Sequence, residues 1–245
     1  MMAGTMKIGL IIPSGGPEAD YYGFEQAARG AVKLYFTISR VGGESSHDHD
    51  PDALRQTAQI EWLLDAALRL KPFGLNCVQW ACTSGSFILG RAFAEKQAAA
   101  LTEAMGAPAT STSLAFAAAC QHFGLSKVGV LATYPPAAAN HFVRFLGEFG
   151  IAVENLHCLH APSGWDAAKF DEALITQSVG RVKGPGIGAV LIPDTALPSL
   201  HYLERLEQSV GMPVLTANAV TLWDAMRVAG RVISVDGQGG LLAGR

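Results

Sequence analysis

Short and nearly continuous apolar runs alternate along this chain with longer segments in which apolar residues recur at helical spacing. Runs rich in β-branched residues and bounded by glycine or proline predict strands at 6–14, 31–39, 75–82, 127–134, 151–159, 187–194 and 212–218. The segments between them predict helices at 50–70, 87–105, 136–149, 165–182, 198–210 and 219–229. Strands that are apolar throughout belong to parallel sheets covered by helices on both faces, so the predicted fold class is α/β.

The two halves of the chain repeat one pattern. KIGLIIPSGG and KVGVLATYPP each read as a basic residue, a strand and a turn, and NCVQWACTSGS and GAVLIPDTALPS each read as a strand followed by a reactive side chain and threonine. We therefore expect two pseudo-symmetric lobes, each a mostly parallel sheet flanked by helices, with the active site in the cleft between them. Residues 1–113 plus 220–245 are assigned to the first lobe and 114–219 to the second, and the glycine-rich tail from 232 is expected to be loose.

Composition and charge narrow the classes of function. Of 245 residues, 49% are hydrophobic and 16% charged, which is typical of a globular protein with an ample core. A net charge of −3 gives no reason to expect a nucleic acid or an anionic membrane as partner. No apolar run approaches the ~18 residues of a membrane span, and the five residues before the first strand are too few for a signal peptide. We expect a cytoplasmic homo-oligomer, a dimer or tetramer.

Candidate chemistry gathers at the predicted strand ends. Ligands of open α/β sheets bind beyond the carboxyl ends of the strands, and Ser14, Cys82, Tyr134 and Asp194 all stand there. Cys82 also precedes a predicted helix, whose first N–H groups would stabilise a thiolate and lower the pKa of the thiol.

The residues after Cys82 suit the binding of an anion. The hydroxyls of Thr83, Ser84 and Ser86 and the local N–H groups could hold a carboxylate, and Gly85 would let a ligand approach the backbone closely. The alternative is that this run only caps the following helix while Cys82 packs in the core. Both interpretations stay open on these residues.

Asp194 occupies the matching place in the second half, with Thr195 after it as Thr83 follows Cys82. Burial and a neighbouring thiolate would raise the pKa of its carboxyl and make it a proton donor near neutral pH. A helix cap or a solvated loop residue is the alternative. We assign Thr195 to substrate binding.

Two further segments carry weaker signals. The Tyr134 hydroxyl could donate to a carboxylate or the ring could pack as a wall, and the turn at Ser14 and Gly15 offers N–H groups to an anion or is a plain turn. SSHDHDPD at 45–52 could hold a metal, but a polar loop before a helix explains it as well. Cys77, Cys120 and Cys158 are interpreted as small buried hydrophobes, and the nucleotide-binding glycine motifs are missing from the sequence.

KIGLIIPS, ACTSGSF, GVLATY and LIPDTALPSL, followed by MPVLTANAVTLWDAMRVAG, resemble the aspartate/glutamate racemase superfamily, in particular its branch of maleate isomerases and arylmalonate decarboxylases. The resemblance covers about residues 6–230. It implies two lobes, no cofactor, no metal and a small carboxylate or dicarboxylate substrate. It also implies that Cys82 is the cysteine of the first lobe, that Thr83, Ser84 and Tyr134 hold the substrate carboxylate and an enediolate-like intermediate, and that the Ser14 loop binds the same group.

The chain departs from that pattern at both lobes. Asp194 stands where the second cysteine is expected, and Gly15 begins a glycine pair where maleate isomerases have an asparagine. Arylmalonate decarboxylases keep the second cysteine and have glycine at the first, so this chain follows neither pattern. Carboxyl and thiol groups with ordinary pKa values of ~3.9 and ~8.5 cannot exchange roles as two thiols would.

Three hypotheses follow. The leading one is a cofactor-independent isomerase of the maleate or racemase type, in which Cys82 is nucleophile or base and Asp194 is the acid. The second is a cofactor-free decarboxylase of a substituted malonate, which needs one proton donor and would be favoured by an apolar pocket for the departing carboxylate. The third is a two-lobed protein that binds a carboxylate without chemistry.

Overall fold

Two parallel four-stranded sheets form the framework of the molecule, seen here in a computed structural model that describes residues 4–13, 18–44 and 46–245. The first sheet has the order β2-β1-β3-β4 and the second β6-β5-β7-β8, so both follow one winding scheme. The strands are β1 Met6–Ile12, β2 Val32–Ile38, β3 Cys77–Trp80, β4 Ala109–Ser111, β5 Lys127–Ala132, β6 Ala152–Cys158, β7 Ala189–Ile192 and β8 Val214–Thr216. The predicted α/β class with two similar lobes is confirmed.

The strands that lead to Cys82 and Asp194 are buried, whereas one edge strand is not. β3 and β7 lie inside their sheets and are buried along their whole length, whereas the edge strand β6 has no buried residue. Cys82 is the second residue after β3, and Asp194 is the second residue after β7. The two side chains therefore occupy equivalent positions in the two lobes, as the sequence repeat predicts.

Three predicted helices are shorter or divided. The segment 50–70 forms α2 Pro51–Thr57 and α3 Ile60–Leu68. The helix predicted at 87–105 begins later, as α5 Arg91–Met105, and the short helix α4 Thr83–Phe87 precedes it. Gly90, at φ 81°, separates α4 from α5 because such a backbone cannot continue a helix. The segment 165–182 forms α8 Gly164–Ala167, α9 Glu172–Val179 and the short helix η2 Gly180–Val182. The Asp171 carboxylate caps α9 by accepting from the Leu174 N–H at 2.9 Å.

The remaining helices include several that the sequence pattern did not single out. α7 Pro136–Gly147, α10 Leu200–Val210 and α11 Ala217–Val228 match predicted helices, and a short helix η1 Lys71–Phe73 follows α3. α1 Glu18–Ala27, α6 Thr112–His122 and strand β4 were not predicted. The tail is not loose as predicted, because it forms α12 Gly240–Ala243 and buries Val235, Leu241 and Leu242.

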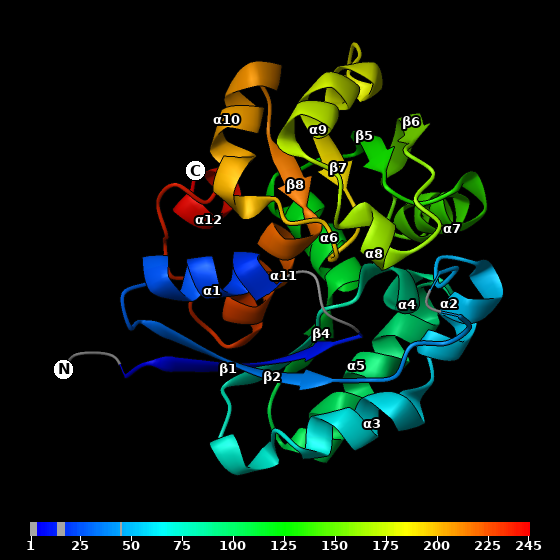
Figure 1. Cartoon of the computed structure of the whole chain (residues 1–245). Helices are drawn as coiled ribbons and strands as arrows, with labels where there is room; N and C mark the ends of the chain where they lie inside the picture. Colours follow the sequence, from blue (N-terminus) through cyan, green and yellow to red (C-terminus); the bar gives the residue numbers. More distant parts are fainter. Residues whose placement is uncertain (1–3, 14–17, 45) are drawn as a thin grey trace.

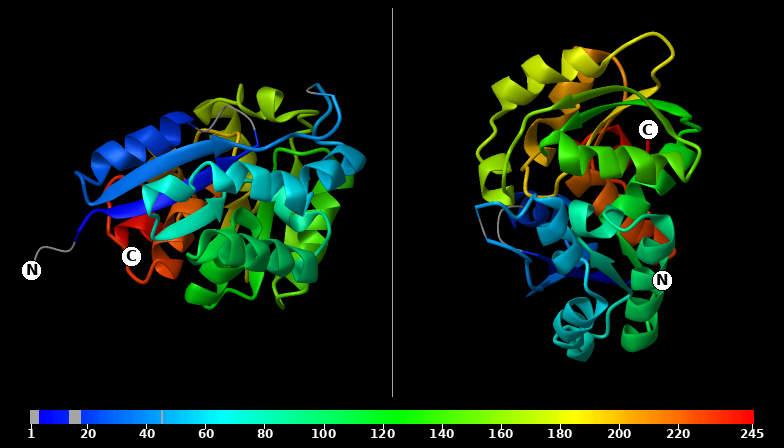
Figure 2. Two further views of the ribbon diagram at one scale, coloured as in Figure 1. Left: turned by 90° about the horizontal axis from the view of Figure 1, so that it is seen from below. Right: turned by 90° about the vertical axis from the view of Figure 1, so that its right-hand side faces the viewer.

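The two lobes are joined through α11 and α1. α11 lies between the sheets and packs against β1, β3, β4 and β8 as well as α6 (Figure 1). The predicted change of lobe at residues 219–220 falls inside this helix. The Asp20 carboxylate of α1 accepts hydrogen bonds from the Ser199 and Leu200 N–H groups at the start of α10. Figure 2 shows the two lobes stacked one above the other in its right-hand view.

Candidate active site

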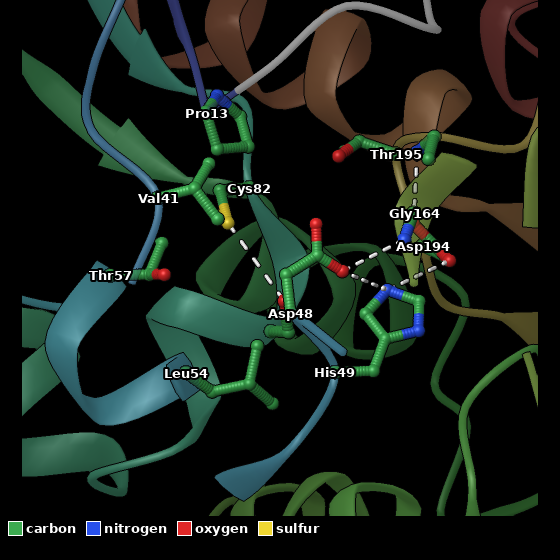
Figure 3. A pocket seen from close by; sticks show the side chains of 12 residues that line it. Pro13, Val41, Asp48, His49, Leu54, Thr57, Cys82, Gly164, Asp194 and Thr195 are labelled. Atoms are coloured by element: carbon green, nitrogen blue, oxygen red, sulfur yellow. Dashed lines mark hydrogen bonds and ion pairs between the residues drawn. The ribbon is translucent and has the colours of Figure 1, made fainter. Parts of the chain in front are cut away.

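Cys82 and Asp194 line one small cavity between the lobes, with a volume of about 40 Å³ (Figure 3). The polar residues around it are Asp48, His49, Thr57, Cys82, Ser84, Asp194 and Thr195. The predicted site residues Ser84 and Thr195 thus lie beside the thiol and the carboxyl. Ser14 and Gly15 fall outside the described residues.

The first lobe supplies an apolar wall. Pro13, Val41 and Leu54 line the cavity and lie on the side of Cys82, whereas Gly164, Asp194 and Thr195 lie on the opposite side (Figure 3). The sequence could not show that these three apolar residues, from different segments, meet in the cavity. A charged group against this wall loses water without gaining a hydrogen bond.

Cys82 begins α4, as expected, but its thiol is not activated. Its Sγ accepts from the Gly85 N–H at 3.4 Å and lies 4.0 Å from Ser84 Oγ, and both contacts lower the pKa. Burial has the larger effect, and with the charges of Asp194 and Asp48 it raises the pKa of the Cys82 thiol to about 12. The predicted lowering is wrong because a short helix start stabilises a thiolate less than desolvation disfavours it. Near neutral pH, Cys82 is a neutral thiol.

Gly85 and Ser86 serve the fold rather than a ligand. A Cβ on Gly85 would lie 2.7 Å from the Trp80 ring and 3.2 Å from Cys82 Sγ, so the missing side chain makes room for the indole. Ser86 Oγ donates toward the carbonyls of Cys82 and Thr83 and contacts Ser113 Oγ at 2.7 Å, which ties α4 to α6. The expectation that these two residues face a carboxylate is wrong.

Asp194 is held in a conformation that few residues adopt. Its φ is 123°, in a region that favours glycine, and such strain concentrates at functional sites. One carboxylate oxygen accepts from Thr133 Oγ1 at 2.7 Å and the other from the Ala196 N–H at 2.9 Å. Burial raises the pKa of Asp194 against the lowering effects of His49 and these two donors. The direction agrees with the prediction, and burial is its main cause.

Asp48 and His49 are cavity residues that the sequence analysis did not assign to the site. They lie just before α2, in a segment that the first lobe extends onto the second. The Gly164 N–H donates to Asp48 Oδ1 at 2.9 Å, and the His49 N–H donates to the Pro162 carbonyl at 3.1 Å. The only signal was the density of histidine and aspartate in that segment. The described residues contain no group of three or more such side chains arranged to hold a metal.

His49 stands between two carboxyl groups. Its Nδ1 lies 2.9 Å from the Ala161 carbonyl, which can only accept, so Nδ1 carries a hydrogen. Its Nε2 lies 3.7 Å from Asp194 Oδ2 and 4.0 Å from Asp48 Oδ1. The imidazole thus lies against the carboxyl groups of both lobes, and its effect on Asp194 is to lower the pKa of that carboxyl.

Tyr134 and Thr83 lie behind the cavity and are not part of its lining. The Tyr134 ring packs edge-on against His49, with 4.6 Å between ring centroids, and against Phe87. Burial raises the pKa of Tyr134 well above its usual value, while the nearby Thr83 and Ser84 hydroxyls lower it by less. Thr83 Oγ1 is buried and has no hydrogen-bond partner within the described part of the chain.

The fold and the cavity define a class: two-lobed α/β proteins with a buried thiol at the end of a central strand of the first lobe. The family model of arylmalonate decarboxylase matches residues 52–242, and the chain belongs to that family. The superfamily resemblance seen in the sequence is thereby confirmed.

No helix in the described part of the chain combines the length and the apolar character needed to cross a bilayer.

Individual relatives fall into two activities. Arylmalonate decarboxylase of Bordetella bronchiseptica is 28% identical over 230 residues, which cover 93% of this chain and 92% of the relative. Maleate isomerase of Geobacillus stearothermophilus is 23% identical over 185 residues, covering 73% and 74%. The structure of a Nocardia farcinica maleate cis-trans isomerase mutant with a covalently bound succinylcysteine intermediate has a TM-score of 0.89 at 18% identity and covers 99% of this chain and 100% of that one. The homologues are thus enzymes that act on small carboxylates.

Proposed function

We propose that this protein is a cofactor-free decarboxylase of malonates with a small substituent, in which the Cys82 thiol protonates the product. The observation that carries the proposal is the pairing of a neutral buried thiol with the apolar wall of Pro13, Val41 and Leu54. Such a wall is the feature that separates the decarboxylase hypothesis from the isomerase hypothesis favoured by the sequence.

The reaction follows from this arrangement. One carboxylate of the malonate lies against the apolar wall, where its charge is poorly solvated, and the bond from the α-carbon to that carboxylate breaks to release neutral CO2. The bonding electrons pass to the α-carbon and the remaining carboxylate as an enediolate. The Cys82 S–H then gives its proton to the α-carbon, and the thiolate that remains regains a proton from solvent. Because burial disfavours that thiolate, the thiol is well suited to give its proton only to a strong base such as this carbanion.

The carboxylate that stays needs hydrogen-bond donors. Ser84 and Thr195 line the cavity and supply hydroxyl groups, and we assign the same role to Ser14 and Gly15 on the resemblance. The Ala196 N–H is already used by Asp194. Removal of one donor that holds an enediolate oxygen costs about 2.7–4 kcal/mol of barrier in comparable sites.

The size of the cavity favours small substituents. An apolar cavity of about 150 Å³ holds a benzene ring, and this one measures about 40 Å³. An aryl group would therefore require the two lobes to move apart, whereas a methyl-sized substituent requires a much smaller movement of the residues that line the cavity.

A maleate-type isomerase remains the second candidate, and Asp194 favours it. A thiol that adds to the double bond of maleate forms a succinyl thioether, the species named for the Nocardia enzyme, and Asp194 could protonate the other carbon. Addition requires a thiolate, which burial of Cys82 opposes. A binding protein without chemistry is the third candidate.

Turnover of a small panel separates these candidates. Methylmalonate, phenylmalonate and maleate are incubated with the wild type, Cys82→Ser and Cys158→Ser, and CO2 and fumarate are measured by carbon NMR. We expect the wild type to release CO2 from methylmalonate. The rate of CO2 release should fall by about 100-fold or more in Cys82→Ser. Cys158→Ser should keep the wild-type rate, because Cys158 lies outside the cavity. Fumarate from maleate without CO2 would favour the isomerase, and neither product would favour the binding protein.

A further inference from the structure

We infer that Asp48 selects the substrate: its cavity-facing carboxylate oxygen accepts a hydrogen bond from a cationic amino group on the α-carbon of the malonate. The inference rests on the proposed function, since it names the class of malonate that the same cavity takes. It concerns a residue whose loop the sequence did not connect with the site.

Asp48 is placed as a recognition group. It is 7% exposed, and Oδ1 is held by the Gly164 N–H at 2.9 Å. Its other oxygen has no hydrogen-bond donor within the described part of the chain and points into the space between Cys82 and Thr195 (Figure 3). A carboxylate oxygen that faces a small cavity has little room for water, so a ligand that supplies a hydrogen-bond donor is favoured there.

The charges around the cavity favour the binding of a cationic group. Its described lining contains two carboxyl groups, Asp48 and Asp194, and one imidazole, His49, but no lysine or arginine. The two carboxyl groups outnumber the one imidazole, so the charge of two ionised carboxylates is not fully offset within the lining. A malonate dianion without a cation adds two negative charges to a site that has little water to screen them. An ammonium group beside Asp48 offsets this repulsion.

The amino group is favoured over other substituents for two reasons. A hydroxyl donates a hydrogen bond but brings no charge, and a further carboxylate would be repelled by Asp48 and Asp194. The small cavity also places the group on or next to the α-carbon, because a long side chain has no room. A charge-assisted hydrogen bond of this kind changes affinity by about tenfold or more.

Aminomalonate and methylmalonate form a matched pair of probes, since they differ in an ammonium against a methyl group. CO2 release, corrected for the uncatalysed reaction, gives kcat/KM for the wild type, Asp48→Asn and the control Asp52→Asn. Asp48→Asn keeps an acceptor for the Gly164 N–H but removes the charge. Asp52 is exposed and pairs with Arg55 outside the cavity. A melting curve with each compound reports binding independently of turnover.

We expect the wild type and Asp52→Asn to prefer aminomalonate by about tenfold or more in kcat/KM. Asp48→Asn should lose that preference, because the charge that favours the ammonium group is gone and no longer repels the methylmalonate dianion. Equal kcat/KM in the wild type, or a preference that survives in Asp48→Asn, overturns the inference and leaves the decarboxylase standing. If no malonate releases CO2, the proposed function fails, and the melting curves decide. Stabilisation by aminomalonate that Asp48→Asn loses supports the inference, and equal stabilisation by both compounds overturns it.

Discussion

His49 Nε2 lies 3.7 Å from Asp194 Oδ2, so a loop of the first lobe reaches the strand-end carboxyl of the second. The same ring is fixed through Nδ1 to the Ala161 carbonyl. The imidazole therefore lowers the pKa of the carboxyl that faces Cys82 across the cavity, against the larger effect of burial.

Replacement of His49 by glutamine should raise the pKa of Asp194 further. The imidazole lowers that pKa, and glutamine of similar reach carries no charge, so the effect of burial is then less opposed. Carbon NMR of aspartate-labelled protein follows the titration, with Asp194→Asn identifying the resonance. An unchanged or lower pKa in His49→Gln would show that the ring does not act on this carboxyl.

The Asp194 carboxyl should make the stability of the protein depend on pH. Its folded-state pKa is raised above the ordinary value of 3.8, so the folded state binds the proton more tightly than the unfolded state. The contribution of the Asp194 carboxyl to the free energy of unfolding is complete below pH 3.8 and is lost as the pH rises through the folded-state pKa. Asp194→Asn should therefore gain stability relative to the wild type as pH rises above 3.8. Urea unfolding at several pH values measures this, and a pH-independent difference between the two proteins would contradict it.

Backbone strain at Asp194 predicts an unusual order of variants. Both Asp194→Gly and Asp194→Ala lose the hydrogen bonds to Thr133 and Ala196, but only glycine relaxes at φ 123°. The glycine variant should be more stable than the alanine variant by about 1 kcal/mol. Denaturant midpoints compare the two directly, and an alanine variant of equal or greater stability would mean that the backbone is not strained here.

Gly85→Ala should destabilise the protein by about 1–3 kcal/mol, because the new Cβ would meet the Trp80 ring at 2.7 Å inside a filled core. Gly147→Ala is the matched control. Gly147 ends α7 with nothing within 4 Å of a Cβ, and alanine there should be neutral or stabilise by up to about 1 kcal/mol. Thermal melting compares the change in stability of the two variants. An equal change in both would contradict the prediction and would mean that the Trp80 ring moves aside for the new Cβ.

Much of the framework could be predicted from the sequence because buried parallel strands have a strong local pattern. The apolar runs that precede Cys82 and Asp194 end at the same edge of their sheets, and this pattern alone predicts that both side chains lie near one cavity. The divided helices were missed because Gly90 and the Asp171 cap are short signals inside longer helical spacing.

The rest of the site depends on contacts between distant segments. Asp48 meets Gly164, which is 116 residues away, and His49 meets Ala161 at a separation of 112. Nothing local to the segment before α2 records these partners. The pKa of Cys82 was predicted in the wrong direction for the same reason, since the helix start is visible in the sequence but the burial of the thiol is not.

The configuration of the product formed in heavy water tests most directly whether the Cys82 thiol protonates the α-carbon. Methylmalonate that loses CO2 in this solvent gives propionate with one deuterium at the α-carbon, and a donor fixed on one side of the cavity predicts a single enantiomer. It also predicts loss of that product in Cys82→Ser. Racemic deuterated propionate, or the same enantiomer at an undiminished rate from Cys82→Ser, would contradict the assignment of Cys82 as the proton donor.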